Sequence, residues 1–370
     1  MGVKTDTLLR DGSMPLWRQI SDSLSDIARQ SEPGSRLPSE RQLCAQFRVQ
    51  RGTVQKAVDF LVARRVLERS PQLGTFVAAA RATTTVALLQ FHLLDTDPIY
   101  LRHARGICEG LAGTGKKLLP MVVLPDGPSE DMMADSLHSM GVSGVIVDRF
   151  SVPADAPLIM RLAKEFTVVA MNKEFVEAAV PCARLDPFQS AAGLVRYLAA
   201  QKVRTLIMFG GHPNNTAFLR RCEAFHAAAT ALGYDHAETL WADETRLAQI
   251  LESAPRPVGI HVLTPNQARQ ALGLARQRGM VAGRDLFMAT YGDGPEAELR
   301  EGVAWAVLDE EGVGFAAAQL LLRHMEGKAE ATEIVNVPCR IVLPPADGGS
   351  MSMEVSVERE PAPERQGDPS

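Results

Sequence analysis

Side chains that can contact nucleic acid are concentrated on one face of residues 51–59. Arg and Gln can each form two hydrogen bonds to the edge of a guanine or an adenine, and Lys suits phosphate groups. At about 100° per residue, the side opposite the apolar positions presents Gly52, Gln55, Lys56 and Asp59, with Arg51 on its flank. Gly52, near the start of this segment, would let the backbone come close to DNA. A solvated face on a core helix looks the same, so this face alone leaves both interpretations open.

The segments that would position this face form a predicted helix-turn-helix. Pro15 suits the first turn of a helix whose apolar spacing continues to a turn at 32–34. Ser39 can cap a second helix, which ends before a short connection at 48–50. The third helix carries an apolar stripe made of Val54, Ala57, Val58 and Leu61. Two short helices joined so tightly are typical of a helix-turn-helix.

A β-hairpin is predicted directly after the third helix, with strands near 66–69 and 75–77. A helix-turn-helix followed by a hairpin is a winged helix. Residues 1–77 hold 12 Lys and Arg against 8 Asp and Glu, a net charge of +4, while the rest of the chain carries −9. A basic segment on an acidic body suggests a polyanionic partner, although differences of this size also arise by chance.

Residues 14–77 resemble the DNA-binding domain of GntR-type transcriptional regulators. Three spaced blocks carry the resemblance: Leu-Pro-Ser-Glu-Arg at 37–41, Arg-x-Thr-Val at 51–54 and Gly-Thr-Phe-Val at 74–77. By position, the resemblance implies DNA contacts from Arg41, Arg51, Thr53, Gln55, Gly74 and Thr75. Two residues depart from the family pattern, because Gln72 replaces a wing glycine and Gly52 is unusual early in a recognition helix.

The body of the chain alternates short apolar runs with amphipathic segments. The predicted strands are 86–91, 118–124, 142–147, 167–171, 205–209, 258–263, 286–290 and 303–307. The predicted helices include 100–111, 129–140, 190–200, 221–232, 265–278 and 311–325. Continuous apolar strands are buried on both faces, which indicates parallel sheets covered by helices. The expected fold class is therefore α/β, a winged helix joined to two doubly wound lobes with a ligand near the strand carboxyl ends.

The body, roughly residues 84–345, resembles the effector domains of LacI-type repressors, which share their fold with periplasmic sugar-binding proteins. The resemblance rests on the order of several segments, at 142–150, 183–199, 203–211, 220–233, 267–294 and 312–328. Together with the head, the chain resembles hybrid regulators that join a GntR-type head to a LacI-type body.

This resemblance implies ligand contacts from loops that follow the strands. Arg221 begins an Arg-x-x-Gly-aromatic motif, here with Ala224 in place of Gly, and would bind ligand hydroxyls through its fork. Asn266 or Gln267 occupies the family's polar loop, and Asp293 is the expected carboxylate. Further candidates after strands or at crossovers are Asp148, Arg149, Asn172 and Asp186, and the aromatic candidates are His92, Tyr100 and Phe218. The competing interpretations are a surface or hinge arginine for Arg221, a solvated turn for Asp293 and core packing for the aromatic side chains.

Several other functions find little support. The glycine-rich run at 110–117 has Lys117 where a P-loop needs Ser or Thr, and it runs from helix to strand. Neither a dinucleotide fingerprint nor a nucleophile elbow occurs, and the eight histidines lack metal-ligand spacing, so we expect no cofactor and no metal. An enzyme with a DNA-binding regulatory head is the alternative function, and an architectural DNA-binder with a vestigial cleft is a third.

The sequence predicts four parts: a winged helix at 1–77, a linker at 78–84, an effector-binding and dimerisation domain at 85–346 and a disordered acidic tail at 347–370. No apolar run is long enough for a membrane span, and five scattered cysteines suit a reducing cytoplasm. We expect a cytoplasmic homodimeric regulator, most simply a repressor, on a pseudopalindromic operator in double-stranded DNA. Its effector would be a small polar ligand, for which a sugar is the expectation from the resemblance.

Overall fold

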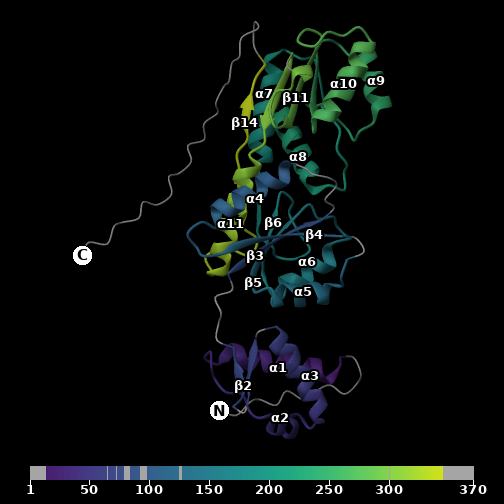
Figure 1. The fold of residues 1–370 in the computed structure, drawn as a ribbon. Coiled ribbons are helices and arrows are strands. Elements are labelled where there is room, and N and C mark those ends of the chain that lie inside the picture. The colour runs from purple at the N-terminus through teal and green to yellow at the C-terminus, as the bar shows by residue number, and fades with distance from the viewer. Residues whose placement is uncertain are drawn as a thin grey trace, which may run out of the picture. The chain divides into compact units, whose positions relative to one another are not determined.

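The computed structural model describes residues 14–64, 66–71, 73–78, 84–91, 98–124, 127–299 and 301–344. The predicted tail and the middle of the predicted linker lie outside these residues. The described part contains a small two-stranded sheet and two six-stranded sheets (Figure 1). Of the helices in these segments, none is long and apolar enough to cross a bilayer.

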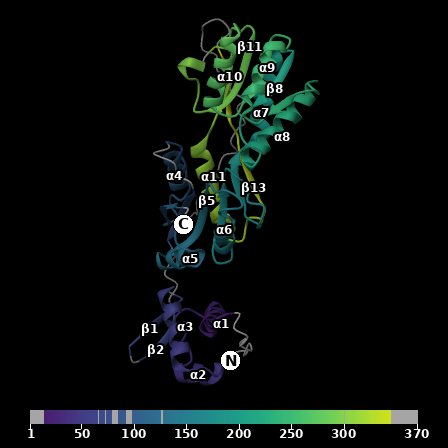
Figure 2. The ribbon, with the colours of Figure 1, turned by 90° about the vertical axis from the view of Figure 1, so that its right-hand side faces the viewer.

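The head is a three-helix unit with a hairpin. Its elements are α1 (Leu16–Gln30), α2 (Glu40–Phe47), α3 (Arg51–Ala63), β1 (Leu67–Ser70) and β2 (Gly74–Val77). The predicted stripe of α3 is fully buried, and α1 lies beside α3 (Figure 2). Ser39 and Gln42 form a capping box at the start of α2, and Arg48 ends this helix in the left-handed conformation, with φ of 53°. The predicted helix-turn-helix is therefore confirmed.

The wing is held against the head by backbone hydrogen bonds. Strands β1 and β2 are antiparallel, with Leu67 opposite Val77 and Ser70 opposite Gly74. The segment before α2 joins them, because Leu37 N donates to Thr75 O at 2.9 Å and Val77 N donates to Ser35 O at 2.8 Å. Gly74 has a φ of 115°, a conformation that a residue with a side chain rarely adopts.

The first large sheet has the strand order β13-β7-β6-β5-β3-β4. Its strands are β3 (Thr85–Phe91), β4 (Lys117–Val123), β5 (Val142–Asp148), β6 (Thr167–Met171), β7 (Cys182–Leu185) and β13 (Ile334–Val337). The helices along this stretch of chain are α4 (Pro98–Gly110), α5 (Glu130–Ser139) and α6 (Ala156–Ala163). The glycine-rich run at 110–117 lies between the end of α4 and the start of β4, so it runs from helix to strand as predicted.

The second large sheet has the strand order β14-β12-β11-β10-β8-β9. Its strands are β8 (Thr205–Phe209), β9 (Glu238–Leu240), β10 (Val258–Val262), β11 (Leu286–Gly292), β12 (Val303–Val307) and β14 (Arg340–Val342). The helices of this part are α7 (Pro187–Ala200), α8 (Thr216–Ala231), α9 (Glu244–Ser253), α10 (Pro265–Gln277) and the short η1 (Ala297–Leu299). Only β14 runs antiparallel to its neighbour among the paired strands described for this sheet.

The chain passes from one sheet to the other more than once. After β7 it continues through α7 to β8 of the second sheet, and after β12 it returns through α11 (Glu310–Met325) to β13 of the first. Helix α11 packs closely on α4 because the contact is lined with glycine: a Cβ added to Gly106 would lie 1.9 Å from Glu311 O. A Cβ added to Gly314 would lie 2.3 Å from His103 O. This close contact places His103 beside the first turn of α11.

Candidate functional site

The side chains predicted to meet DNA lie on the surface of the head. Arg41, Arg51, Gly52, Lys56 and Gly74 are exposed, and Thr53, Gln55 and Thr75 are partly exposed. They come from α2, from α3 and from the wing strand β2. Their roles as DNA contacts stay predictions.

Acidic side chains hold two arginines of this surface in place. Arg51 Nε lies 3.1 Å from Glu40 Oε2, and an Arg69 nitrogen lies 3.3 Å from Glu40 Oε1. Arg69 also bonds Asp59 at 2.5 Å. Because the Arg51 side chain is 74% exposed, its pair with Glu40 is easily exchanged for a stronger acceptor such as a phosphate or a base edge.

An aromatic group supports α3 from the side of α1. Trp17 packs edge-on against Phe60, with 5.3 Å between ring centroids. Lys56 Nζ lies 4.7 Å from the Trp17 ring, and the Arg18 guanidinium lies 4.6 Å from the Phe60 ring. The lysine predicted to contact phosphate is thus held over an aromatic face by a cation–π interaction.

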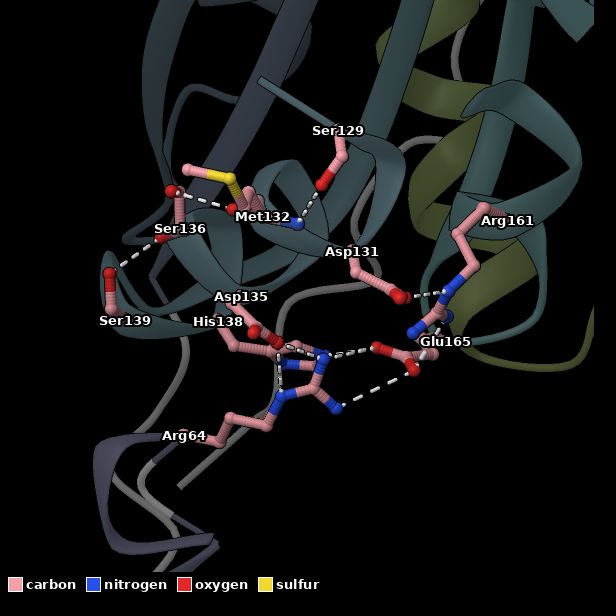
Figure 3. Close-up of polar contacts among 10 residues, drawn as sticks. All are labelled: Arg64, Ser129, Asp131, Met132, Asp135, Ser136, His138, Ser139, Arg161 and Glu165. Carbon is pink, nitrogen blue, oxygen red and sulfur yellow. Dashed lines mark hydrogen bonds and ion pairs between the residues drawn. The ribbon is translucent and has the colours of Figure 1, made fainter. Parts of the chain in front are cut away.

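The end of α3 joins a cluster of charged side chains, drawn in Figure 3. Arg64, which caps α3, donates from Nε to Asp135 Oδ1 at 2.8 Å and lies 3.2 Å from Glu165 Oε2. Its side chain is only 11% exposed. Glu165 also accepts from Arg161 at 2.6 Å and lies 2.8 Å from His138 Nε2. We call Arg64, Asp131, Asp135, His138, Arg161 and Glu165 the Arg64 cluster.

The Arg64 cluster keeps Glu165 ionised. Burial raises the pKa of this carboxyl, but the bonds from His138 and Arg161 and the nearby charge of Arg64 outweigh it. The net effect holds the pKa of Glu165 well below its ordinary value. The last turn of the predicted recognition helix is therefore tied, through Arg64, to a carboxylate that stays charged at any physiological pH.

A separate pocket of about 190 Å³ lies among the ends of several elements. Polar side chains dominate its lining: His103, Asp148, Arg149, Asn172, Lys173, Glu174, Arg184, Arg220, Arg221 and Glu310. They come from α4, the ends of β5 and β6, strand β7, helix α8 and the start of α11. The volume is below the ~300–1,000 Å³ usual for drug-sized ligands, so the pocket suits a small metabolite.

Two of these residues adopt a strained backbone. Arg149 directly follows β5 with a φ of 58°, and Asn172 directly follows β6 with a φ of 62°. Residues other than glycine rarely adopt this left-handed backbone conformation, and those that do cluster at binding sites. Both positions were predicted as ligand residues.

A buried histidine links the end of β5 to the start of α11 in the pocket lining. His103 Nδ1 lies 3.1 Å from Asp148 Oδ2, and its Nε2 lies 2.6 Å from Glu310 Oε2. Burial lowers the pKa of His103, but the bonds and charges of the two carboxylates outweigh it and raise this pKa to about 9. His103 is therefore protonated at neutral pH and donates to both carboxylates. Asn172 Nδ2 donates to Glu310 Oε2 at 3.3 Å and completes the group.

The Arg221 guanidinium lies over the ring of Tyr291. The guanidinium carbon is 4.1 Å from the ring centroid of Tyr291, which is fully buried. The Tyr291 hydroxyl lies 3.2 Å from His261 Nε2, and burial together with the charge of Arg221 lowers the pKa of His261 to about 3. His261 is therefore neutral at physiological pH.

Glu174 organises two further arginines of the pocket. It bonds Arg184 closely and accepts from Arg220 at 2.9 Å and 3.2 Å, one nitrogen on each carboxylate oxygen. Such forked bonds fix the orientation of a guanidinium.

The predicted ligand residues divide into two groups. Arg149, Asn172 and Arg221 line the pocket, as does Asp148. Asp186 accepts from the backbone of Phe188 and Gln189 and so caps α7, whose first residue lines the pocket.

The remaining candidates lie elsewhere. Asp293 pairs with Arg102 at 2.7 Å, Asn266 accepts from Arg269, and Gln267 lies at the start of α10 against Gly210. Phe218 packs near Gly211, Tyr100 is partly exposed on α4, and His92 lies outside the described residues. None of the described ones is among the residues lining this pocket.

Sequence reasoning missed His103, Glu310, Lys173, Glu174, Arg184 and Arg220. Lys173 and Glu174 could have been found, because they continue directly from Asn172 after a predicted strand. Arg220 precedes Arg221 on the same predicted motif. His103 and Glu310 lie on helices 207 positions apart, and only the fold brings them together.

Comparison with known proteins identifies both parts of the chain. Residues 18–77 match the family described as bacterial regulatory proteins, gntR family, and residues 195–343 match the periplasmic binding protein-like domain. The arabinose metabolism transcriptional repressor of Geobacillus stearothermophilus is 21% identical over 345 residues, which cover 87% of this chain and 94% of that protein.

Solved structures agree on the fold. A LacI-family regulatory protein from Chloroflexus aggregans superposes with a TM-score of 0.58 at 17% identity, covering 72% of this chain and 99% of that one. The complex of the transcriptional regulator CelR with cellobiose gives a TM-score of 0.57 at 17% identity, covering 83% and 99%. The chain thus joins a head that matches the gntR family to a periplasmic-binding-protein-like domain, whose fold is shared with LacI-family proteins. It is a DNA-binding transcriptional regulator, and the families that it matches are not enzymes.

Proposed function

We propose that this regulator is a repressor whose binding to operator DNA is controlled by a sugar-like effector in the pocket lined by Arg149, Asn172 and Arg221. The winged helix (1–77) would bind DNA, and residues 85–346 would bind the effector and dimerise. Two heads would then occupy the half-sites of a pseudopalindromic operator in the cytoplasm.

The observation that carries the proposal is a small pocket, lined mainly by charged and polar residues, in a chain whose head is a DNA-binding domain. Carboxylate, amide and guanidinium groups suit the hydroxyl groups of a sugar. The names of the arabinose metabolism repressor and of the CelR–cellobiose complex support a sugar among the possible polar metabolites. A ligand shifts operator affinity only by binding the two states of the protein unequally.

The DNA half of the proposal is tested by operator selection. The full chain would be used to select sequences from fragmented genomic DNA, and the selected site would be measured by mobility shift. We expect Arg51→Ala to abolish specific binding and Arg284→Ala, a change at an arginine paired with its neighbour Asp285, to leave it intact. Unchanged operator affinity of Arg51→Ala would contradict the recognition-helix assignment.

The effector half is tested by thermal shift with sugars, sugar acids, sugar phosphates and nucleobases. A ligand at 100 times its Kd adds about 2.7 kcal/mol to stability. We expect a sugar-type compound to raise the melting temperature and to change operator affinity, and Arg221→Ala to lose both responses.

The proposed dimer is tested by sedimentation velocity. A monomer at micromolar concentration would contradict it.

A further inference from the structure

Arg36 lies on the wing of the head, although in the chain it stands between α1 and α2. Its backbone forms an antiparallel bridge with Phe76 of β2. Backbone hydrogen bonds of 2.9 Å and 2.8 Å on the two sides of this bridge attach the segment to the edge of the hairpin. The family resemblance assigns DNA contacts of the wing to Gly74 and Thr75, and Arg36 is not among the residues that it implies.

The bridge decides which face of the wing carries the Arg36 side chain. Successive residues of a strand point to opposite faces. The buried residues of one face are Leu37, Leu67 and Val77. Arg69 lies on this same face, two residues after the first residue of β1, and its guanidinium bonds Asp59 of α3. Arg36 therefore lies on the other face, which points away from α3.

The Arg36 guanidinium lies close to the backbone of Gly74 on this outer face. A Cβ added to Gly74 would be 3.2 Å from Arg36 Nε and 3.4 Å from its Nη2. Glycine at this position therefore does two things. It adopts a φ of 115°, and it leaves room for the arginine side chain beside the tip of the wing.

The charge of Arg36 is exposed and, within the described residues, no hydrogen bond or ion pair engages its side chain. Arg51 and Arg69 differ in this respect, because Glu40 pairs with both. Glu68 lies on the same outer face, but it is opposite Phe76 on the far strand of the hairpin, about 10 Å from Arg36 at the usual strand spacing. An exposed guanidinium with uncommitted donors suits a phosphate group.

We propose that Arg36 binds a phosphate of the DNA backbone on the side of the wing that faces away from α3. A DNA groove has a phosphate backbone along each border, and the minor groove is only about 6 Å wide. A wing that enters this groove therefore meets both backbones, one on each face. This inference rests on the proposed binding of DNA by the head and does not depend on the effector.

The test measures binding of the full chain to its selected operator and to an unrelated duplex of equal length, between about 50 and 200 mM salt. We expect Arg36→Gln to weaken binding to both duplexes by a similar factor, about 10-fold at the lowest salt, because a phosphate contact carries no sequence information. The slope of log affinity against log salt concentration should decrease in magnitude by about 0.9 for each phosphate contact that is lost.

Two further variants separate the local contact from the change in net charge. Arg36→Lys keeps the charge and should retain most of the salt slope. Arg284→Gln removes the same charge from an arginine of the body and should keep both the affinity and the slope of the wild type. Because the Arg36 side chain is exposed, all three variants should melt at the temperature of the wild type.

The possible outcomes are distinguishable. Wild-type affinity and salt slope in Arg36→Gln would overturn the proposal and leave the DNA-binding role of the head intact. A loss of affinity confined to the operator, with an unchanged slope, would also overturn it, because Arg36 would then contact a base. If the wild-type chain binds neither duplex, the proposed DNA binding of the head is wrong, and the role of Arg36 is wrong with it.

Discussion

A buried positive charge at His103 holds two acidic side chains of the pocket together. The imidazole is 1% exposed and contacts two carboxylates that are themselves buried. A charge in this position is stable only while both partners remain ionised. The folded protein therefore binds a proton at His103 more tightly than the unfolded chain does.

Stability should consequently depend on pH through His103. The folded pKa of about 9 lies above the ordinary 6.5, so the contribution is fully present below pH 6.5 and is lost as the pH rises through 9. The linkage amounts to about 3 kcal/mol. We expect the free energy of unfolding in urea to fall between pH 6.5 and 9 in the wild type and to be lower but flatter in His103→Gln.

The exposed His236 supplies the matched control, since His236→Gln should retain the wild-type pH profile. If the free energy of unfolding of His103→Gln falls with pH as steeply as that of the wild type, another group causes the pH dependence.

At the level of elements, the contact between α4 and α11 depends on missing side chains. Gly106 and Gly314 let the two helices approach until a Cβ on either would overlap the backbone of the other. This approach brings His103 to Glu310, so the packing of the helices and the geometry of the pocket are set by the same residues.

Adding a methyl group at this contact should be destabilising. We expect Gly106→Ala to lower the free energy of unfolding by about 1–3 kcal/mol, because the helices must separate. Gly273→Ala on α10, where a Cβ meets nothing within 4 Å, should instead add about 0.5–1 kcal/mol. Chemical denaturation measures the free energy of unfolding of both variants. Equal changes in the two variants would contradict the close contact between α4 and α11.

Gly52 provides a test at the start of α3. A Cβ there meets nothing within 4 Å in the protein, so Gly52→Ala should stabilise the head by about 0.5–1 kcal/mol. If the backbone of this turn approaches DNA closely, the same change should weaken operator binding. Thermal melts and mobility shifts on one preparation should show higher stability together with weaker operator binding. Stronger operator binding would show that the backbone stays clear of DNA.

Helices and strands with a clear cap or apolar periodicity could be predicted from the sequence, and short elements without these signals could not. The helices of the head, with Ser39 as a cap and Val54, Ala57, Val58 and Leu61 as a stripe, match the prediction. Helices α6 and α9 and the short strands β7, β9, β13 and β14 were not predicted. The pairing of β13 with β7 joins residues far apart in the chain, which local periodicity cannot indicate. The pocket residues that were predicted are Asp148, Arg149 and Asn172, which end or directly follow strands, and Arg221, which was found through the family motif.

At the scale of the whole molecule, the proposed effector and the operator would influence each other equally. If the effector weakens operator binding by some factor, typically about 5–150-fold, the operator weakens effector binding by that factor. Arg64 ties the end of α3 to Asp135 and Glu165, so we expect Arg64→Gln to reduce this factor. Calorimetric titration of the effector with and without operator measures it in both proteins, with Arg284→Gln as the control. An unchanged factor in Arg64→Gln would exclude the Arg64 cluster from the coupling.

The placement of the three tryptophans makes the head and the second sheet optically distinguishable. Trp17 lies under the Lys56 ammonium, and Trp305 is fully buried with its indole nitrogen 3.4 Å from Leu299 O. After Trp241→Phe, emission comes only from these two environments. A phosphate that draws Lys56 away from the indole would change the fluorescence of Trp17 and leave that of Trp305 constant. The intrinsic fluorescence of Trp17 would then report occupancy of the DNA-binding surface, without an attached dye.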